Sequence, residues 1–486
     1  MPKDSSFYTG SLIYRDINFT FIFDGEKLQL IPPTDKKHEV SHWFMNSLGN
    51  GVYAWGKPLY MEEAYLVGKC NETSHLIIFL PKQNSHIGSQ NTVLFVDLFA
   101  YIICKYNRKL IDRVSFYGPE INCIHPVSQA ISYSFDFDQS FDDGIITLAT
   151  KDFDKTTTAA QEFIVDGKTI NVFFSVDRSI SQKIGEPPLT LNSVLNFEFT
   201  PTNDYTFIFR LWRIAKRFIQ FLCYRNNISL LSADLFSPYE DGKHERFATF
   251  YTVNETLDSE LDTLKSRRYI KQQYITGYEG KILSDIASNS IYTRHLPESY
   301  RSGRHYNAAR FIMITAAFEW EFSRLYPEGI KKKESTLQVE AKAAEEIDAL
   351  ILKSTGKLKS IYKFFKKLIG SDKLQEKLEY IETDFDAIIG AIGRHLYRLN
   401  DEELVYAEMG KRLADQRNHF AHGDLNEEFI GLSLLDLMFL EYIIYAMQLH
   451  LYGVDNQYIQ LAINDLFHLN LALPFPEKGT DADQQS

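Results

Sequence analysis

The first 200 residues have the pattern of β-strands, and apolar and polar residues alternate in Tyr133–Asp138 and Asn196–Phe199 as in half-buried strands. Phe19–Phe23 and Lys27–Leu30 are predicted strands that flank a turn at Asp24 and Gly25. Further strands are predicted at His75–Leu80, Thr92–Phe99, Tyr133–Asp138, Gly144–Ala149, Thr169–Val176 and Asn196–Phe199. Turn-forming residues separate these segments. The pattern predicts an antiparallel β-rich domain, built as a sandwich or a barrel-like sheet.

Between Asn203 and Tyr224 the apolar residues recur every three or four positions, which predicts an amphipathic helix. Its apolar face comprises Phe207, Leu211, Ile214, Phe218 and Phe221, and the neighbouring face carries Arg210, Arg213 and Arg217. Strands are predicted again at Ser229–Phe236 and Arg246–Val253, and Asn254–Asn289 is predicted to be mostly helical. The polar run Pro297–Gly303 marks the expected boundary. Residues 1–300 are therefore assigned to a β-rich N-terminal region, mixed α/β after about residue 203.

Nearly everything after residue 300 has the period of an α-helix. Helices are predicted at Arg304–Leu325, Thr336–Leu352, Leu358–Ile369, Leu374–Leu399, Glu402–Ala421, Asn426–Tyr452 and Asn456–Leu469. The short connections favour an all-α up-and-down bundle over residues 301–473. The polar tail, residues 474–486, is predicted to be disordered.

Charge and cysteine content narrow the possible functions. A net charge of −12 argues against a general nucleic-acid coat protein, but it leaves room for one small basic cleft. The cysteines, Cys70, Cys104, Cys123 and Cys223, lie far apart and form neither a zinc-ribbon pattern nor a disulfide scaffold. The N-terminus lacks the features of a signal peptide, and no apolar run reaches the roughly 18 residues needed to cross a bilayer. We expect a cytoplasmic protein with no membrane partner.

His38-Glu39-Val40-Ser41-His42 matches H-E-x-x-H, a pattern in which two histidines on a helix hold zinc and the glutamate activates water. The segment lies in a β-rich region with room for only a short helix, and no third ligand is identified. A solvated polar turn is the expected structure, and a zinc peptidase is an alternative.

Lys353–Gly370 carries six lysines and no acid, together with an apolar stripe at helical spacing formed by Leu358, Ile361, Phe365 and Leu368. A basic amphipathic helix can meet a membrane surface or RNA phosphates. We expect the stripe to pack in the bundle and the lysines to be solvated.

The stretch Arg417–His422 (RNHFAH) ends the helix predicted at 402–421, and Gly423 follows as a C-terminal cap. Arginine holds phosphate through a rigid fork of donors, and histidine transfers protons near neutral pH. On a regular helix, five residues turn the chain by about 500°, so Arg417 and His422 would diverge by about 140°. Either the helix ends between them or a second copy of the chain completes the site. A surface arginine and a histidine at a helix C-terminus would account for the same residues without any chemistry.

The R-N-x-x-x-H string within an all-α C-terminal region resembles the signature of the HEPN superfamily, R-x(4–6)-H, in which a polar residue often follows the arginine. Ala316–Glu321 (AAFEWE) resembles part of the first core helix of that domain. A β-rich region followed by such a bundle is similar to the ApeA-type anti-phage proteins. The resemblance is carried by motifs in the C-terminal bundle and is architectural over residues 1–300.

This resemblance implies a metal-independent endoribonuclease, a hydrolase that needs no cofactor and acts as a homodimer or higher homo-oligomer. His422 would serve as general base or acid for attack of a 2′-hydroxyl on the adjacent phosphate, and Arg417 would stabilise the developing charge. Asn418 and His419 would support the site or bind substrate. The implied role is abortive-infection defence, in which the N-terminal region senses a phage-derived trigger and RNA is cleaved, with transfer RNA among the candidates. The alternative is a non-catalytic HEPN protein that uses the bundle for dimerisation and the β-rich region for ligand binding.

Overall fold

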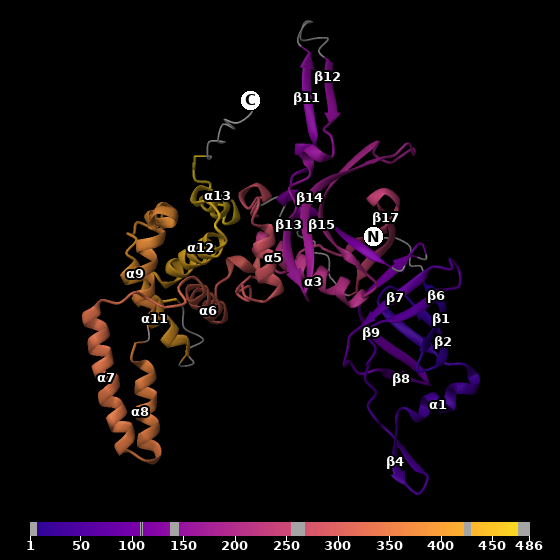
Figure 1. Cartoon of the computed structure of the whole chain (residues 1–486), viewed down its shortest axis with the longest axis horizontal. Helices are drawn as coiled ribbons and strands as arrows, with labels where there is room; N and C mark the ends of the chain where they lie inside the picture. The colour runs from indigo at the N-terminus through magenta and orange to yellow at the C-terminus, as the bar shows by residue number, and fades with distance from the viewer. Residues whose placement is uncertain are drawn as a thin grey trace. The chain divides into compact units, whose positions relative to one another are not determined.

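The computed structural model describes residues 7–474 except 107, 109, 137–144, 254–267, 371 and 422–428. Contacts divide the chain into two compact units, Met1–Ser288 and Asn289–Ser486 (Figure 1). The first unit is β-rich and the second is helical, so the predicted α+β multidomain class is confirmed. Residues 289–300, assigned to the first region by sequence, belong to the helical unit. Their backbone is held there, because the Tyr292 N–H donates to Glu321 at 2.7 Å and the Trp320 indole N–H donates to the Ser290 carbonyl at 2.6 Å.

Parts of several predicted segments lie outside the described residues. They are the ends of the strands at 133–138 and 144–149, the first part of the helical stretch at 254–289, the start of the helix at 426–452, and the tail from residue 475.

Six strands of the first unit close into an antiparallel barrel (Figure 1). They are β1 (Tyr8–Tyr14), β2 (Ile17–Phe23), β3 (Lys27–Ile31), β6 (Leu66–Cys70), β7 (Leu76–Pro81) and β9 (Val93–Cys104). The order β9-β3-β2-β1-β6-β7 returns to β9, because β7 also pairs with the second half of that strand. Of the two sheet forms that the sequence allowed, the barrel is therefore the one present.

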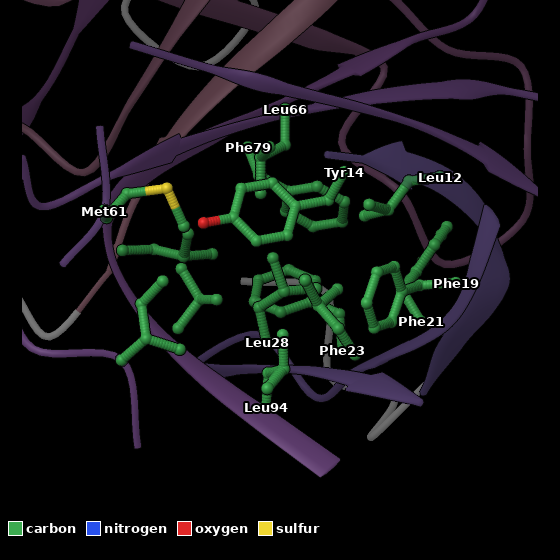
Figure 2. Packing of buried hydrophobic residues seen from close by; sticks show 14 of the residues in the cluster. Leu12, Tyr14, Phe19, Phe21, Phe23, Leu28, Met61, Leu66, Phe79 and Leu94 are labelled. Carbon is green, nitrogen blue, oxygen red and sulfur yellow. The ribbon is translucent and has the colours of Figure 1, made fainter. Parts of the chain in front are cut away.

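The barrel interior is filled by aromatic and aliphatic side chains from alternate strand positions (Figure 2). In β2, Phe19, Phe21 and Phe23 are fully buried, whereas the residues between them are more exposed. Phe21 lies against a glycine of β6, since a Cβ added at Gly68 would come within 2.7 Å of the Phe21 ring. A missing side chain on one strand thus makes room for a large one on another.

A second set of strands continues the sheet from the second half of β9, which pairs with both β7 and β17, in the order β17-β16-β10-β15-β14-β13. Their bounds are β10 (Ile111–Tyr117), β13 (Gln161–Val165), β14 (Lys168–Ile180), β15 (Leu189–Thr202), β16 (Ser232–Pro238) and β17 (His244–Thr252). Helix α3 (Tyr205–Cys223) packs its apolar face on this sheet, where Phe207 meets Phe199 and Phe218 meets Phe174. The amphipathic helix predicted at 203–224 is confirmed.

The remaining α-helices and strands that the structure describes in the first unit are short. They are α1 (Lys37–His42), α2 (Pro119–Ile124), α5 (Glu279–Ala287), β8 (Gly88–Gln90), and two separate hairpins, β4 (Met45–Gly49) with β5 (Val52–Trp55) and β11 (Ile131–Asp136) with β12 (Ile145–Thr150).

The helical unit is built around one apolar helix. Its elements are α6 (Ala308–Leu325), α7 (Glu334–Lys353), α8 (Gly356–Leu368), α9 (Leu374–Phe385), α10 (Ala391–Arg398), α11 (Tyr406–Ala421), α12 (Ser433–Tyr452) and α13 (Asn456–Leu466). A π-helical segment, Asp386–Gly390, joins α9 to α10 within the helix predicted at 374–399. Helix α12 is long and apolar enough to cross a membrane, but 78% of its most apolar window is buried inside the unit. Such burial is typical of a core helix.

Helices α7 and α8 pair with each other as a hairpin (Figure 1). Neither helix contains a buried residue. The expectation that the apolar stripe of Lys353–Gly370 packs in the bundle is therefore wrong, since Leu358, Ile361, Phe365 and Leu368 are each at least 40% exposed. A stripe at helical spacing shows which side of a helix is apolar, but not whether another helix covers it.

Candidate active site

Helix α11 carries the predicted catalytic string and is anchored by its apolar side. Met409, Leu413 and Phe420 are buried, and the Phe420 ring packs edge-on against Phe311 of α6 at 5.3 Å. The helix reaches Ala421, the end predicted from sequence. Its C-terminal turn therefore holds three of the four predicted site residues in fixed directions around the helix axis.

The three predicted site residues that the structure describes, Arg417, Asn418 and His419, do not share one face of α11. Arg417 is half exposed and lies 3.8 Å from the Glu319 carboxylate of α6. Asn418 and His419 line a pocket whose described lining does not include Arg417. A two-residue step turns a helix by about 200°, which places Arg417 and His419 on nearly opposite flanks. His422 lies outside the described residues.

The pocket beside α11 has a volume of about 590 Å³. It is lined by Arg412, Asp415, Gln416, Asn418 and His419 of α11, and by Ile430 and Gly431 ahead of α12. The size and polar lining suit a small polar group such as one nucleotide unit. Gln416 forms its inner wall, because its side-chain carbonyl accepts hydrogen bonds from the Ile430 N–H and the Ser433 hydroxyl, both at 2.9 Å.

Sequence reasoning missed the ion pair that holds α11 in place. Arg412 donates two hydrogen bonds of 2.7 Å to the fully buried carboxylate of Asp436 on α12, and the Tyr397 hydroxyl donates a third. Burial raises the pKa of the Asp436 carboxyl, and the bonds from Arg412 and Tyr397 oppose that rise. An acid within an apolar run was the signal that could have revealed it, because a buried carboxylate requires a partner.

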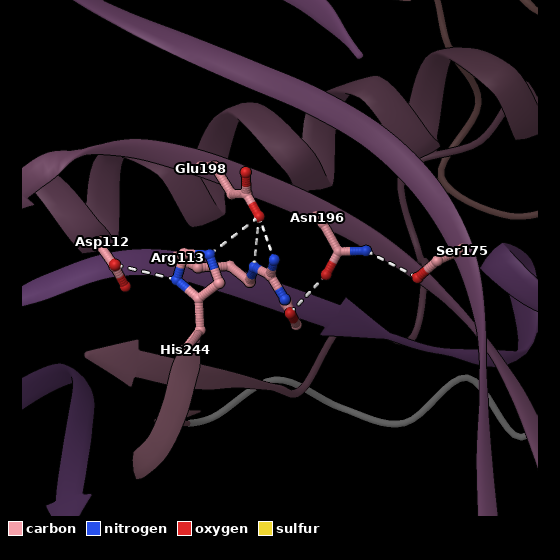
Figure 3. Close-up of polar contacts among 7 residues, drawn as sticks. Asp112, Arg113, Ser175, Asn196, Glu198 and His244 are labelled. Atoms are coloured by element: carbon pink, nitrogen blue, oxygen red, sulfur yellow. Dashed lines mark hydrogen bonds and ion pairs between the residues drawn. The ribbon is translucent and has the colours of Figure 1, made fainter. Parts of the chain in front are cut away.

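A second polar cluster ties three strands of the first unit together (Figure 3). The His244 ring lies between two carboxylates, with Nδ1 2.9 Å from Asp112 and Nε2 3.5 Å from Glu198. Glu198 also accepts a hydrogen bond of 2.7 Å from Arg113 Nε on the neighbouring strand. Because Arg113 already neutralises Glu198, we assign this cluster to cross-strand stabilisation of the sheet.

The H-E-x-x-H segment forms α1, a helix of six residues. The rings of His38 and His42 lie 4.6 Å apart, but Glu39 is bound by Lys36 at 2.8 Å. Among the described residues, no group of three His, Cys, Asp or Glu side chains could hold a metal ion. The described part of the chain therefore supplies no complete zinc site at α1.

The fold and the site together define a two-unit α+β protein with a polar pocket on the motif-bearing helix of its helical unit. Comparisons with family models, curated proteins and solved structures found no significant match.

Proposed function

We propose that this protein is a metal-independent endoribonuclease of the HEPN type. The observation that carries the proposal is the string Arg417–His422, whose residues 417–421 belong to α11 and whose Asn418 and His419 line a polar pocket of the helical unit. Asn418 and His419 line that pocket, which gives substrate a place next to the string.

In the proposed reaction, His422 takes the proton of a 2′-hydroxyl, whose oxygen attacks the adjacent phosphorus. The bond from phosphorus to the 5′-oxygen breaks, and that oxygen receives a proton from a histidine. The products are a 2′,3′-cyclic phosphate and a 5′-hydroxyl. Arg417 stabilises the negative charge that develops on the phosphate, and Asn418 orients the substrate. His419 supports the site or binds substrate from its position in the pocket lining.

A shared site in a homodimer or higher homo-oligomer accounts for the positions of these residues. Arg417 and the pocket residues occupy different flanks of α11, so one helix alone does not present them to the same phosphate. A second copy would supply the missing flank. Arg417 is also close enough to Glu319 for an ion pair, which an RNA phosphate would have to displace.

The proposed setting is abortive-infection defence in the cytoplasm. The separate β-rich unit, Met1–Ser288, would sense a phage-derived trigger and restrain the nuclease. A ribonuclease that is active at all times would be toxic, which explains the need for a large regulatory unit.

Expression of the parent, Arg417→Ala and His422→Ala in cells tests the proposal. Removing a general acid or base slows such a reaction by about 10²–10⁴-fold. We expect both variants to lose toxicity and to leave cellular RNA intact under triggering conditions. Sequencing of RNA ends should find cyclic phosphates only with the parent, and EDTA should not inhibit the purified enzyme.

Matched controls are Arg398→Ala and His305→Ala, which remove exposed residues of the same types from the same unit. Both should behave like the parent. Equal toxicity and equal RNA integrity for the parent and the two motif variants would refute the nuclease proposal.

A non-catalytic, ligand-binding protein is the second candidate. The proximity of Arg417 to Glu319 favours it, because an arginine that already has a carboxylate is less available to a phosphate. It predicts that both motif variants keep function while changes on the β-rich unit abolish it.

A further inference from the structure

Helix α8 has an apolar side that is largely exposed. Its apolar stripe is at least 40% exposed at every position and comprises Leu358, Ile361, Phe365 and Leu368. Phe364, beside the stripe, is 59% exposed. Single exposed apolar residues are normal on a protein surface, but five large ones gathered on one helix mark an interaction surface.

The other helix of the hairpin meets a different side of α8. Lys359 and Tyr362 are partly buried, and Lys366 forms an ion pair with Asp348 of α7. These three residues of α8 mark the side that faces α7, and the centre of the stripe lies about 110° away from them around the helix axis. Pairing with α7 therefore leaves the stripe open.

The rest of α8 is basic. The helix contains no acid and five lysines, Lys357, Lys359, Lys363, Lys366 and Lys367. Lys366 is paired with Asp348, and among the described residues no carboxylate lies within ion-pair distance of the other four. The acids of the hairpin belong to α7. In a chain with a net charge of −12, α8 thus concentrates positive charge next to an exposed apolar side.

An anionic lipid surface fits both features of α8. The apolar side of such a helix enters the boundary between headgroups and acyl chains, while the lysines extend to the headgroups. A nucleic-acid backbone would neutralise the lysines but leave the stripe in water, because phosphates offer no apolar surface. A second copy packed stripe to stripe would cover the apolar groups, but it would bring two sets of five lysines together, and like charges repel.

We propose that α8 attaches this protein peripherally to an anionic lipid surface. The stripe and Phe364 enter the lipid boundary, and the lysines contact the headgroups. Attachment of this kind needs no membrane-spanning helix, and a cytoplasmic protein meets an anionic leaflet at the membrane. The proposal replaces the expectation from sequence that the protein has no membrane partner. It goes beyond the proposed cleavage reaction and stands without it, because α8 contains none of the predicted site residues.

Flotation of the full-length protein with lipid vesicles tests the proposal. One set of vesicles is phosphatidylcholine alone, and the other is phosphatidylcholine and phosphatidylglycerol in equal parts. The parent should bind the anionic vesicles more tightly, and this binding should weaken as salt screens the charges. Phe364→Ser/Phe365→Ser should weaken binding roughly 10- to 100-fold, because two apolar rings no longer leave water. Lys363→Gln/Lys367→Gln should weaken binding to the anionic vesicles by about 5-fold for each lysine.

Matched controls separate insertion from general stickiness. Phe364→Leu/Phe365→Leu keeps the apolar side and should bind. Leu399→Ser removes an apolar residue that is 69% exposed outside the hairpin, and Lys183→Gln removes a lysine whose side chain is 80% exposed. Both should bind like the parent. All variants should keep the circular dichroism of the parent, since the replaced side chains are exposed.

Three results would overturn the proposal. The first is a parent that binds neither set of vesicles. The second is binding that depends on the lysines but not on the two phenylalanines, because that is adsorption without insertion. The third is dissociation of a parent oligomer by Phe364→Ser/Phe365→Ser in analytical ultracentrifugation without any vesicle binding, which assigns the stripe to contact between copies. Binding of a short RNA in place of vesicles belongs with the first result and assigns the lysines to nucleic acid.

Discussion

Replacing Arg412 with methionine should destabilise the helical unit, because it leaves the Asp436 carboxylate buried without its guanidinium partner. The carboxylate loses both 2.7 Å hydrogen bonds and keeps only the Tyr397 hydroxyl. Removing one member of a buried ion pair costs about 3–5 kcal/mol. We expect the low end, about 3 kcal/mol, because the Arg412 side chain is 27% exposed and water can reach the vacated position. In a unit of this size, such a loss lowers the melting temperature by roughly 6–12 °C.

The assay is urea unfolding followed by far-ultraviolet circular dichroism, with hydrogen exchange of α12 as a local measure. The control is Arg394→Met, which removes an exposed arginine paired with Asp386 at 2.8 Å and should cost about 0–1 kcal/mol. The double variant Arg412→Met/Asp436→Leu should recover most of the loss, since an apolar pair needs no hydrogen bonds. The reasoning is refuted if Arg412→Met costs no more than Arg394→Met, or if the double variant is as unstable as the single one.

Two further predictions concern stability. Burial lowers the pKa of His295 to about 3 from 6.5, so the unfolded chain binds the extra proton below about pH 6.5 and stability falls as pH falls through that window. Between about pH 7.5 and about pH 5, this proton lowers the free energy of unfolding by about 2 kcal/mol. Urea unfolding at both pH values should show that His295→Leu removes this loss and that the control His305→Ala does not. In the barrel, Gly68→Ala should cost about 1–3 kcal/mol because its Cβ would lie 2.7 Å from the Phe21 ring, and its urea midpoint should rise again on adding Phe21→Leu. Gly88→Ala is the control, since a Cβ there meets only an ordinary contact at 3.6 Å; equal losses at the two glycines would contradict the packing argument.

Local patterns predicted the strands well, but not how they assemble. The strands predicted at Phe19–Phe23 and Lys27–Leu30 match β2 and β3 closely. The closure of the barrel depends on β9 pairing with β3 along its first half and with β7 along its second half. Alternation shows the direction of a side chain but not the partner of a strand, so barrel and sandwich could not be separated from sequence.

In the candidate site too, the sequence predicted the local helix but not how it packs with the rest of the unit. The sequence predicted a helix that reaches Ala421, and α11 does so. The predicted divergence of Arg417 and His422 stays a prediction, because His422 lies outside the described residues. The pocket could not be predicted, because its walls come from α11 and from the residues that precede α12. The pairing of Arg412 with Asp436 could not be predicted either, because the two residues lie 24 positions apart in the sequence.

Helix α12 explains why that ion pair matters for the site. Nearly all of its side chains are buried, so apolar packing alone would select no particular rotation of its neighbours. Its buried polar residues each have a specific partner: Asp436 binds Arg412, Glu441 binds Arg310 at 2.8 Å, and Gln448 donates to Glu321 at 3.0 Å. Rotating a neighbouring helix by one residue would leave at least one of these buried polar groups without its hydrogen bond. Each group left unsatisfied would cost about 1–3 kcal/mol of stability.

The buried pair between Arg412 and Asp436 therefore fixes the rotation of α11 about its own axis. That rotation decides which side chains of α11 can face a substrate. Asn418 and His419 are directed to the pocket, whereas Arg417 stays half exposed on the flank near Glu319. Under the proposed function, a phosphate bound at the pocket cannot reach Arg417 of the same helix unless α11 rotates and breaks the buried pair. Completion of the site by a second copy avoids that cost, so the proposed ribonuclease activity should depend on self-association.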